Sequence, residues 1–577
     1  MAELQRLLIA NRGEIALRIV RACRESGIAS VVAVTPSERA GAPAELADAT
    51  IDIDSYLDAR AIVEGAVRTG ADSVHPGYGF LAEDAAFAQL VLDAGLRWVG
   101  PPPEAMRALG DKVAARAVAE AAGVPVVPGL DIDHFSDEAV RREAAHLGTP
   151  LFVKASAGGG GRGMRTVRDL DELGAMVAAG RREAQASFGD GRVFLERRLE
   201  RVRHIEVQVL LDDHGTGVHL GERDCSLQRR HQKIVEESPS PAVDPTLRSA
   251  LGEAAIAIAE RAGYRGAGTA EFLVDDHGSW WFLELNARLQ VEHPVTEAVT
   301  GIDHVRAQLT IAAGERLQLD QSQVSRRGHA IEARVYAEDP ATGFLPTGGR
   351  VERLDLPQWP GVRVDTALRE GDVVGTGFDP LLAKVIAWGE NRPHAFSRLS
   401  AALSELHIVG VATNLGFLLD VLDHPDVIDG LVDTDWVETV WVPQVPPLPE
   451  GVSASGDPTD PWVAFGSARR DLPRGVVVAG AAAQYRGWGY ALAGDELDAN
   501  ELSRNDGSLV APMPATVLSV HVATGDAVVA GQVVAQLEAM KIQVQVNAPS
   551  SGVVRSVHAR AGDIVARGAR LIELEET

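Results

Sequence analysis

Residues 511–538 read APMPATVLSVHVATGDAVVAGQVVAQLE, and residues 548–575 read APSSGVVRSVHARAGDIVARGARLIELE. The second stretch repeats the first, with Ala-Pro, Ser-Val-His, Gly-Asp and Leu-Glu segments at the same spacing. In each copy, short apolar runs are separated by Gly-Asp turns, which is typical of β-strands. We therefore predict a β-sandwich with pseudo-twofold symmetry over residues 508–577, with Lys541 exposed in the hairpin between the copies.

The residues around Lys541 indicate a carrier of a covalent group. A lysine on a tight turn is ordinarily a solvated surface charge. Glu538-Ala-Met-Lys541 nevertheless resembles biotin carboxyl carrier domains, as does the earlier Ala511-Pro-Met-Pro514, although Ile542 and Ala515 replace the commoner Met and Gly. The alternative is a lipoyl carrier, whose lysine usually follows Asp, whereas Met540 stands here. The resemblance implies biotin on Lys541, attached by a biotin protein ligase.

The composition is that of a large soluble globular protein. With 577 residues, 46% hydrophobic and 24% charged, the chain should form three or more folding units. A net charge of −26 opposes nucleic-acid binding, because phosphate backbones attract basic surfaces. Only Cys23 and Cys225 are present, which argues against a disulfide framework. No signal peptide is visible, and the longest apolar run, at 476–483, is too short to span a bilayer, so we expect a cytoplasmic protein that does not cross membranes.

The N-terminal part shows the alternation of a parallel α/β layer. Apolar strands are expected at 7–10 and 31–34, with an amphipathic helix at 14–25 between them. The prolines between Pro443 and Pro461 predict a spacer and the main domain boundary. Residues 476–507 are compatible with a few strands.

A candidate phosphate site lies around Lys154. Residues 151–154 form an apolar strand that ends in this lysine, and the glycine run Gly158–Gly163 follows. Glycine lets backbone amides approach phosphates closely, although the spacing differs from that of a P-loop. Together with Lys112, the pattern resembles the lid and lysine pair of ATP-grasp enzymes, whose lid closes over a triphosphate.

Residues 269–286 are predicted to form a hairpin closed by a four-residue turn at 275–278. In that register Glu271 faces Phe282, Glu284 is a diagonal neighbour on the same face, and Leu283 and Leu285 are buried behind. Two such carboxylates are unfavourable without a cation between them, which predicts a magnesium site. Polar residues then recur at every second position and predict an active-site floor: Asn286, Arg288, Gln290 and Glu292.

Four motifs resemble the biotin carboxylase family, and the resemblance spans about residues 1–446. They are Asn11-Arg-Gly-Glu-Ile-Ala, His75-Pro-Gly-Tyr-Gly-Phe, Arg223-Asp-Cys-Ser-Leu-Gln-Arg-Arg-His-Gln-Lys233 and Glu284-Leu-Asn-Ala-Arg-Leu-Gln-Val-Glu-His293. The resemblance implies an α/β and α+β fold followed by an all-β flattened barrel. The implied domains are a Rossmann-like layer at 1–125, a mobile ATP-grasp lid at 126–203, the ATP-grasp core with the C-terminal carboxylase domain at 204–446, a Pro-rich linker at 447–507, and a biotinyl domain at 508–577.

The same resemblance implies roles for individual residues. Glu292 would be the general base that deprotonates bicarbonate, and Arg334 would stabilise the enolate form of biotin. Bicarbonate would be surrounded by Lys233, Arg288, Gln290 and Val291, and Mg²⁺ or Mn²⁺ would be bound by Glu271, Glu284 and Asn286. ATP would be held by Lys112, Lys154, Gly160, Gly161, Met164, Glu196, Arg197, His204, Gln228 and His231. Arg197-Arg198 stands where the family often has Lys-Tyr, which is a departure at the expected adenine contacts.

The favoured interpretation is the α subunit of an acyl-CoA carboxylase. Such a subunit uses ATP and bicarbonate to carboxylate biotin through carboxyphosphate, and a separate carboxyltransferase β subunit passes the carboxyl group to an acetyl- or propionyl-type acyl-CoA. A homo-oligomer formed through the carboxylase domain is expected. Two alternatives stay open: the corresponding subunit of a pyruvate-type carboxylase, and a carrier scaffold with an inactive ATP site.

Overall fold

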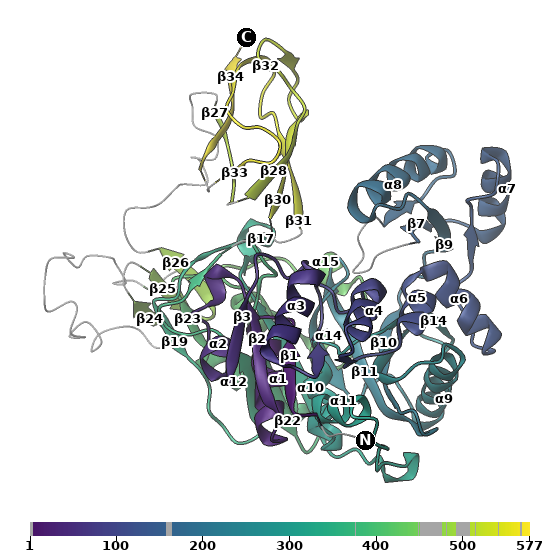
Figure 1. Ribbon diagram of the computed structural model, residues 1–577. Helices are drawn as coiled ribbons and strands as arrows, with labels where there is room; N and C mark the ends of the chain where they lie inside the picture. The colour runs from purple at the N-terminus through teal and green to yellow at the C-terminus, as the bar shows by residue number, and fades with distance from the viewer. Residues whose placement is uncertain are drawn as a thin grey trace, which may run out of the picture.

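The computed structural model describes residues 4–156, 164–375, 377–447, 449, 476–479, 482–491, 508–513, 515–539, 542–565 and 568–576. Figure 1 shows a main body, a smaller unit with α7 and α8 that projects from it, and a β domain at the C-terminal end. Within these described ranges, no helix is long and apolar enough to cross a membrane.

The N-terminal unit is a parallel sheet covered by helices on both faces. Its strand order is β3-β2-β1-β4-β5. Successive residues of β1 point to opposite faces, so Leu8 joins one apolar core and Leu7 joins another. The predicted Rossmann-like layer is confirmed. The elements are β1 (Arg6–Ile9), α1 (Gly13–Glu25), β2 (Ala29–Val34), α2 (Ala42–Leu46), β3 (Ala49–Asp52), α3 (Ala59–Thr69), β4 (Ser73–His75), α4 (Ala85–Asp93), β5 (Arg97–Trp98) and α5 (Pro103–Gly110).

The projecting unit has an antiparallel sheet and an apolar core of its own. The strand order is β6-β9-β7-β8, and Val153 and Leu195 pack in a core with Ala144 and Ala184. A separate core lets such a unit move as one body, as a lid requires. The elements are β6 (Gly129–Asp131), α7 (Asp137–Leu147), β7 (Leu151–Ala155), β8 (Arg165–Val167), α8 (Leu173–Phe188) and β9 (Val193–Arg197). The boundaries 126 and 203 stay predictions.

An eight-stranded antiparallel sheet forms the centre of the main body, in the order β14-β13-β10-β11-β12-β15-β22-β20. Its strands are β10 (Arg203–Leu211), β11 (Gly217–Arg229), β12 (Gln232–Ser238), β13 (Gly266–Val274), β14 (Trp280–Asn286), β15 (His329–Tyr336), β20 (Val362–Thr366) and β22 (Leu381–Gly389). The helices of this part are α6 (Lys112–Ala121), α9 (Pro245–Arg261), α10 (His293–Thr300), α11 (His304–Ala312), α12 (Arg392–Glu405), α13 (Leu415–Leu422), α14 (Pro425–Ile428) and α15 (Trp436–Thr439).

A small three-stranded sheet from residues 476–491 packs on the C-terminal carboxylase part. It consists of β24 (Val476–Ala479), β25 (Ala482–Tyr485) and β26 (Trp488–Ala491). Gln484 donates to the Leu406 carbonyl at 3.0 Å and accepts from the Ile408 amide at 2.9 Å. Trp488 is buried against Gly416, where the absence of a side chain makes room for the indole. This part of the predicted linker therefore belongs to a packed structure.

The C-terminal domain confirms the predicted duplicated sandwich. Strands β28, β29 and β30 of the first copy correspond in position and length to β32, β33 and β34 of the second. The short strand β33 of the second copy pairs with β28 of the first, and β29 of the first copy pairs with β32 of the second. Each sheet of the sandwich therefore contains strands from both copies. The elements are β27 (Ser508–Val510), β28 (Ala515–Val520), β29 (Ala527–Val528), β30 (Val533–Ala539), β31 (Ile542–Asn547), β32 (Gly552–Val557), β33 (Ile564–Val565) and β34 (Arg570–Glu576).

The strands on either side of the carrier lysine form the expected hairpin. β30 ends at Ala539 and β31 begins at Ile542, and these two residues are paired in the antiparallel register. Lys541 itself lies outside the described residues, so its position at the hairpin tip stays a prediction.

Candidate active site

Lys233 on β12 is the centre of a buried ionic cluster. Its Nζ lies 2.5 Å from Glu206 Oε2, 2.7 Å from Glu271 Oε1 and 2.8 Å from Glu292 Oε1. The carboxylates come from β10, β13 and the residue before α10, so three segments distant in sequence meet at one ammonium group. Burial alone would lower the pKa of Lys233, but the three carboxylates together hold it well above its usual value. Lys233 is therefore a permanent cation.

Glu292 is held between two cations. Arg334 on β15 donates from Nη2 to Glu292 Oε2 at 2.8 Å, opposite the contact with Lys233. Burial would raise the pKa of Glu292, but Lys233 and Arg334 hold it well below the usual value. The side chain is fully buried, and its lowered pKa keeps it unprotonated and able to accept a proton, as a weak base while Lys233 and Arg334 contact it.

The carboxylates predicted to bind metal face each other directly. Glu271 pairs with Glu284 across β13 and β14. The predicted register, with Glu271 opposite Phe282, is wrong because a bulge follows Glu271 and shifts the partner strand. Leu283 lies at this bulge and is only half-buried, which corrects its predicted burial, whereas Leu285 is buried as expected.

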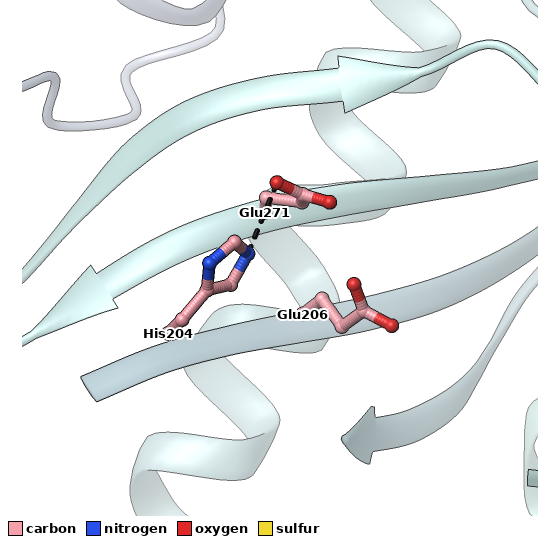
Figure 2. Close-up of side chains that lie close together, drawn as sticks. All are labelled: His204, Glu206 and Glu271. Carbon is pink, nitrogen blue, oxygen red and sulfur yellow. Dashed lines mark ion pairs between the residues drawn. The ribbon is translucent and has the colours of Figure 1, made fainter. Parts of the chain in front are cut away.

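The groups around this pair fit a hard divalent cation. Glu271 Oε1 accepts from Asn286 Nδ2 at 2.9 Å, and Glu284 lies 3.5 Å from Lys112 Nζ. Figure 2 shows Glu271 beside His204 and Glu206, whose possible ligand atoms lie within 4.8 Å of one another. His204 Nε2 is 3.0 Å from Glu271 Oε2. Carboxylate and amide oxygens are ligands that Mg²⁺ accepts, so the donor set agrees with the predicted site.

The residues predicted to form an active-site floor lie on one segment after β14, and the last of them, Glu292, immediately precedes α10. Arg288 donates to Gln290 Oε1 at 2.7 Å and to Asn286 Oδ1 at 3.0 Å, and it pairs with Glu83 at 3.0 Å. Val291 presents its carbonyl to Lys384 Nζ at 2.9 Å. The segment after β14 thus gathers the residues predicted to surround bicarbonate.

The residues predicted to hold ATP lie on two units. Lys154 and Glu196 form an ion pair on the lid sheet, and Arg116 also contacts Glu196 at 3.2 Å. Met164, half-buried, precedes β8, and Arg197 is exposed at the end of β9. On the central sheet, Gln228 is buried opposite Lys233, and the ring of His231 lies 6.3 Å from that of Phe152. Gly160 and Gly161 lie outside the described residues.

The sequence analysis missed several buried groups of the site. Glu206 binds Lys233, and Arg223 pairs with Glu206 and donates to Gln208 at 3.0 Å. A signal was available, because His204, Glu206 and Gln208 place polar groups at every second position of an apolar strand. Two further carboxylates were also missed, Glu236 and Glu332, which lie next to Arg334.

Four sequence families match successive parts of the chain. They are the biotin carboxylase N-terminal domain at 3–106, the carbamoyl-phosphate synthase L chain ATP-binding domain at 111–320, the biotin carboxylase C-terminal domain at 332–439, and a biotin-requiring enzyme domain at 507–574. A biotin carboxylase of Nostoc sp. is 46% identical over 439 residues, which is 75% of this chain and 98% of that protein. The chain belongs to the biotin carboxylase family. It joins a biotin carboxylase, an ATP-dependent ligase, to a biotin carrier domain.

Other relatives cover different shares of the chain. The biotin-dependent acyl-coenzyme A carboxylase alpha3 subunit of Mycobacterium leprae is 40% identical over 579 residues, 95% of this chain and 94% of that one. The mitochondrial methylcrotonoyl-CoA carboxylase subunit alpha of rice is 47% identical, but the match spans only 60% of its length and 75% of this chain.

Solved structures show the same carboxylase fold. The biotin carboxylase domain dimer of Hydrogenobacter thermophilus 2-oxoglutarate carboxylase, in complex with MgADP, ADP and bicarbonate, is 42% identical with a TM-score of 0.74. The match covers 76% of this chain and 98% of that one. Biotin carboxylase from Campylobacter jejuni is 40% identical with the same TM-score, over 76% of this chain and 99% of that one.

Proposed function

We propose that the chain uses ATP and bicarbonate to carboxylate biotin attached to its own Lys541, and that a separate carboxyltransferase β subunit passes the carboxyl group to an acyl-CoA. The observation that carries the proposal is the Glu292 carboxylate, buried and ionised between Lys233 and Arg334. It stands in a chain that also contains a carrier domain.

Cationic side chains of the site form a local basic pocket for an anionic substrate. Bicarbonate, an anion, needs a local basic pocket because the net charge of the chain is −26. Lys233 and Arg288 provide that pocket, with Gln290 as a further polar contact. Phosphorylation of bicarbonate by ATP gives carboxyphosphate, a far better carboxyl donor. Lys112, Lys154 and His231 are the phosphate-side contacts in this proposal.

Glu292 and Arg334 divide the proton and charge chemistry between them. Glu292 takes the proton of bicarbonate, so that the oxygen can attack the γ-phosphate. Arg334 stabilises negative charge as it develops on the ureido oxygen of the substrate. Biotin, when attached, supplies the ureido nitrogen that accepts the carboxyl group. Because both side chains are buried, their electrostatic effect is stronger than it would be in water.

The metal contacts follow from the paired strands β13 and β14. Glu271, Glu284 and Asn286 would hold Mg²⁺ or Mn²⁺, which neutralises phosphate charge when bound. Lys112, next to Glu284, orients a phosphate oxygen from the same side.

An acyl-CoA is the acceptor that the comparisons favour. The Mycobacterium leprae relative, which matches over 95% of this chain, is an acyl-CoA carboxylase subunit, and the rice relative is a subunit of methylcrotonoyl-CoA carboxylase. A homodimer through the carboxylase domain is part of the proposal, since the Hydrogenobacter domain is a dimer. The alternative, a subunit of a pyruvate-type carboxylase, predicts instead that pyruvate is carboxylated and acyl-CoA is not.

Three measurements test the function. ATP cleavage should require both biotin and bicarbonate, and the absence of any such cleavage would support the scaffold with an inactive ATP site. The biotinylated chain, mixed with a β subunit, should carboxylate acetyl- or propionyl-CoA and leave pyruvate unchanged. Lys541→Arg should abolish transfer while leaving ATP cleavage with free biotin intact, because the substitution removes only the attachment amine.

A further inference from the structure

A hairpin of the carboxylase contacts the carrier domain. It consists of β16 (Glu338–Asp339), a 3₁₀ turn at Pro340–Thr342, and β17 (Leu345–Pro346). Leu345 is half-buried and packs against the apolar core of the carrier. In Figure 1 the carrier stands next to β17 with the ends of β30 and β31 nearest to it. These ends flank residues 540 and 541 in the sequence.

The packing of Phe344 in the carboxylase core fixes the hairpin, with Leu345 on the side that contacts the carrier domain. Phe344 has a φ of 64°, an uncommon conformation for a bulky residue. Its ring is buried against Phe417 at 5.0 Å and Trp441 at 5.6 Å between ring centroids. The guanidinium of Arg229 lies 4.2 Å from the same ring. The inward anchoring of Phe344 leaves the next side chain free for the carrier.

The hairpin also lies close to the reacting groups. β15 carries Arg334, and the chain continues through Tyr336 into β16. Four residues of extended backbone separate Arg334 from Glu338, so their Cα atoms lie no more than about 13 Å apart. Arg229 at the end of β11 donates to Glu338 Oε2 at 2.8 Å, which fixes β16 beside the turn that carries His231. A carrier seated on β17 is therefore within reach of the site through a long flexible arm.

We propose that the hairpin Glu338–Pro346 is the surface on which the chain's own carrier domain docks when its biotin is loaded, with Leu345 as the apolar contact. The inference rests on the proposed function and adds the docking surface to it. The observed occupant is the carrier itself, whose core already includes Leu345 among its neighbours.

The test compares tethered and free biotin. Leu345→Asp should slow the incorporation of radiolabelled bicarbonate into the biotinylated chain about tenfold, which corresponds to about 1.4 kcal/mol. In a Lys541→Arg background, the same variant should cleave ATP with free biotin at the unsubstituted rate. The control is Val373→Asp, at a position 74% exposed on a short strand that pairs with residues 349–350, which should change neither reaction.

Each outcome is decisive. Equal loss in both assays would mean that Leu345→Asp damages the carboxylase fold, and no loss in either would mean that the carrier docks elsewhere; both results overturn the docking surface. If the unsubstituted chain fails with free biotin as well, it is the proposed function that has failed.

A second, independent observation concerns two buried carboxylates. Glu236 on β12 lies directly opposite Glu332 on β15, and both side chains are fully buried. Neither oxygen of Glu332 has a hydrogen-bond partner among the described residues. Glu236 Oε1 is 2.5 Å from Arg334 Nε, while Nη2 of the same guanidinium holds Glu292.

Two such groups resist being ionised together. Burial raises the pKa of Glu236 to about 7 and that of Glu332 well above its usual value, and the negative charge of Glu236 raises the pKa of Glu332 further. One proton shared by the pair leaves one negative charge beneath Arg334. The other charged groups that face the pair are Lys233, Lys384, Glu206 and Glu292.

We propose that Glu236 and Glu332 share one proton and act as positioning residues that hold Arg334 toward Glu292. Loss of the remaining charge on acidification would release the guanidinium, so the acid limb of the rate profile depends on this pair. The proposal concerns the orientation of Arg334 and also rests on the proposed function.

The test is the pH dependence of ATP cleavage with free biotin. Glu332→Gln should move the acid limb to higher pH by at least about half a unit, because an amide donates a weaker hydrogen bond to the remaining Glu236 carboxylate than the acid that shares its proton. Ile386→Val, a core change at the residue opposite Glu332, should lower stability without moving the limb. An unmoved limb in Glu332→Gln, or an equal movement in Ile386→Val, would refute the shared proton. No biotin-dependent cleavage in the unsubstituted chain would refute the function instead.

Discussion

Replacing Lys233 by Met should destabilise the carboxylase strongly. The ammonium lies within 2.8 Å of three carboxylates, each with a side chain no more than 5% exposed, so water cannot replace it. Removal of one partner from a buried ionic cluster costs about 3–5 kcal/mol. A carboxylase of roughly 440 residues has an unfolding entropy of about 0.9 kcal/mol/K, so that loss lowers the melting temperature by about 3–5 °C.

The destabilisation should depend on pH with a definite sign. Lys233 helps to hold the pKa values of Glu271 and Glu292 below 4.5, so the stability that it confers is present above that pH and is lost as pH falls through the lowered folded values. The difference between unsubstituted chain and variant should therefore be full between pH 5 and pH 7 and shrink only as the pH falls below about 4.5. Protonation of the unpaired carboxylates then relieves their repulsion.

Differential scanning calorimetry at several pH values measures this effect. A matched control is Arg39→Met, which breaks an ion pair whose partners are 59% and 66% exposed and should cost no more than about 1 kcal/mol. An unchanged melting temperature in Lys233→Met at pH 7, or a loss that does not shrink between pH 5 and pH 3.5, would refute the buried cluster as described.

Three further predictions follow from the same contacts. Glu292→Gln should slow bicarbonate-dependent ATP cleavage at least about 100-fold, because an amide cannot accept the proton, and near-normal turnover would contradict its role as base. Glu284→Gln should raise the magnesium concentration needed for half-maximal ATP cleavage; an identical magnesium titration would exclude this carboxylate from the metal site. Trp488→Ala should cost about 3–5 kcal/mol in a thermal or denaturant melt because the indole is buried against Gly416, and an unaltered melt would show that β26 contributes no packing.

Local patterns predicted the parts of the fold that are themselves local. The parallel strands at the N-terminus follow from short apolar runs with helices between them, and the carrier follows from its repeated turns. The pairing of β28 with β33 matches that of β32 with β29, as expected for two equivalent halves that share one core. Residues 476–491 gave no firm expectation, since their anchors, Gly416 and Leu406, lie far away in the sequence.

Site residues that belong to sequence motifs could be predicted, whereas contacts that arise from the pairing of distant strands could not. Glu292, Lys233 and Arg334 were singled out by resemblance, and the structure brings them together. A one-residue bulge after Glu271 changed its partner, and no propensity in the sequence indicates such a bulge. Glu236 and Glu332 meet only because β12 pairs with β15, and that long-range register is invisible in either strand alone.

The central claim is that this chain carries, on Lys541, the group that its own carboxylase loads. Intact mass spectrometry of the chain, produced together with a biotin protein ligase, tests it most directly. We predict a mass increase of one biotinyl group that is absent from Lys541→Arg. An unmodified mass, or an increase that persists in the variant, would contradict the account.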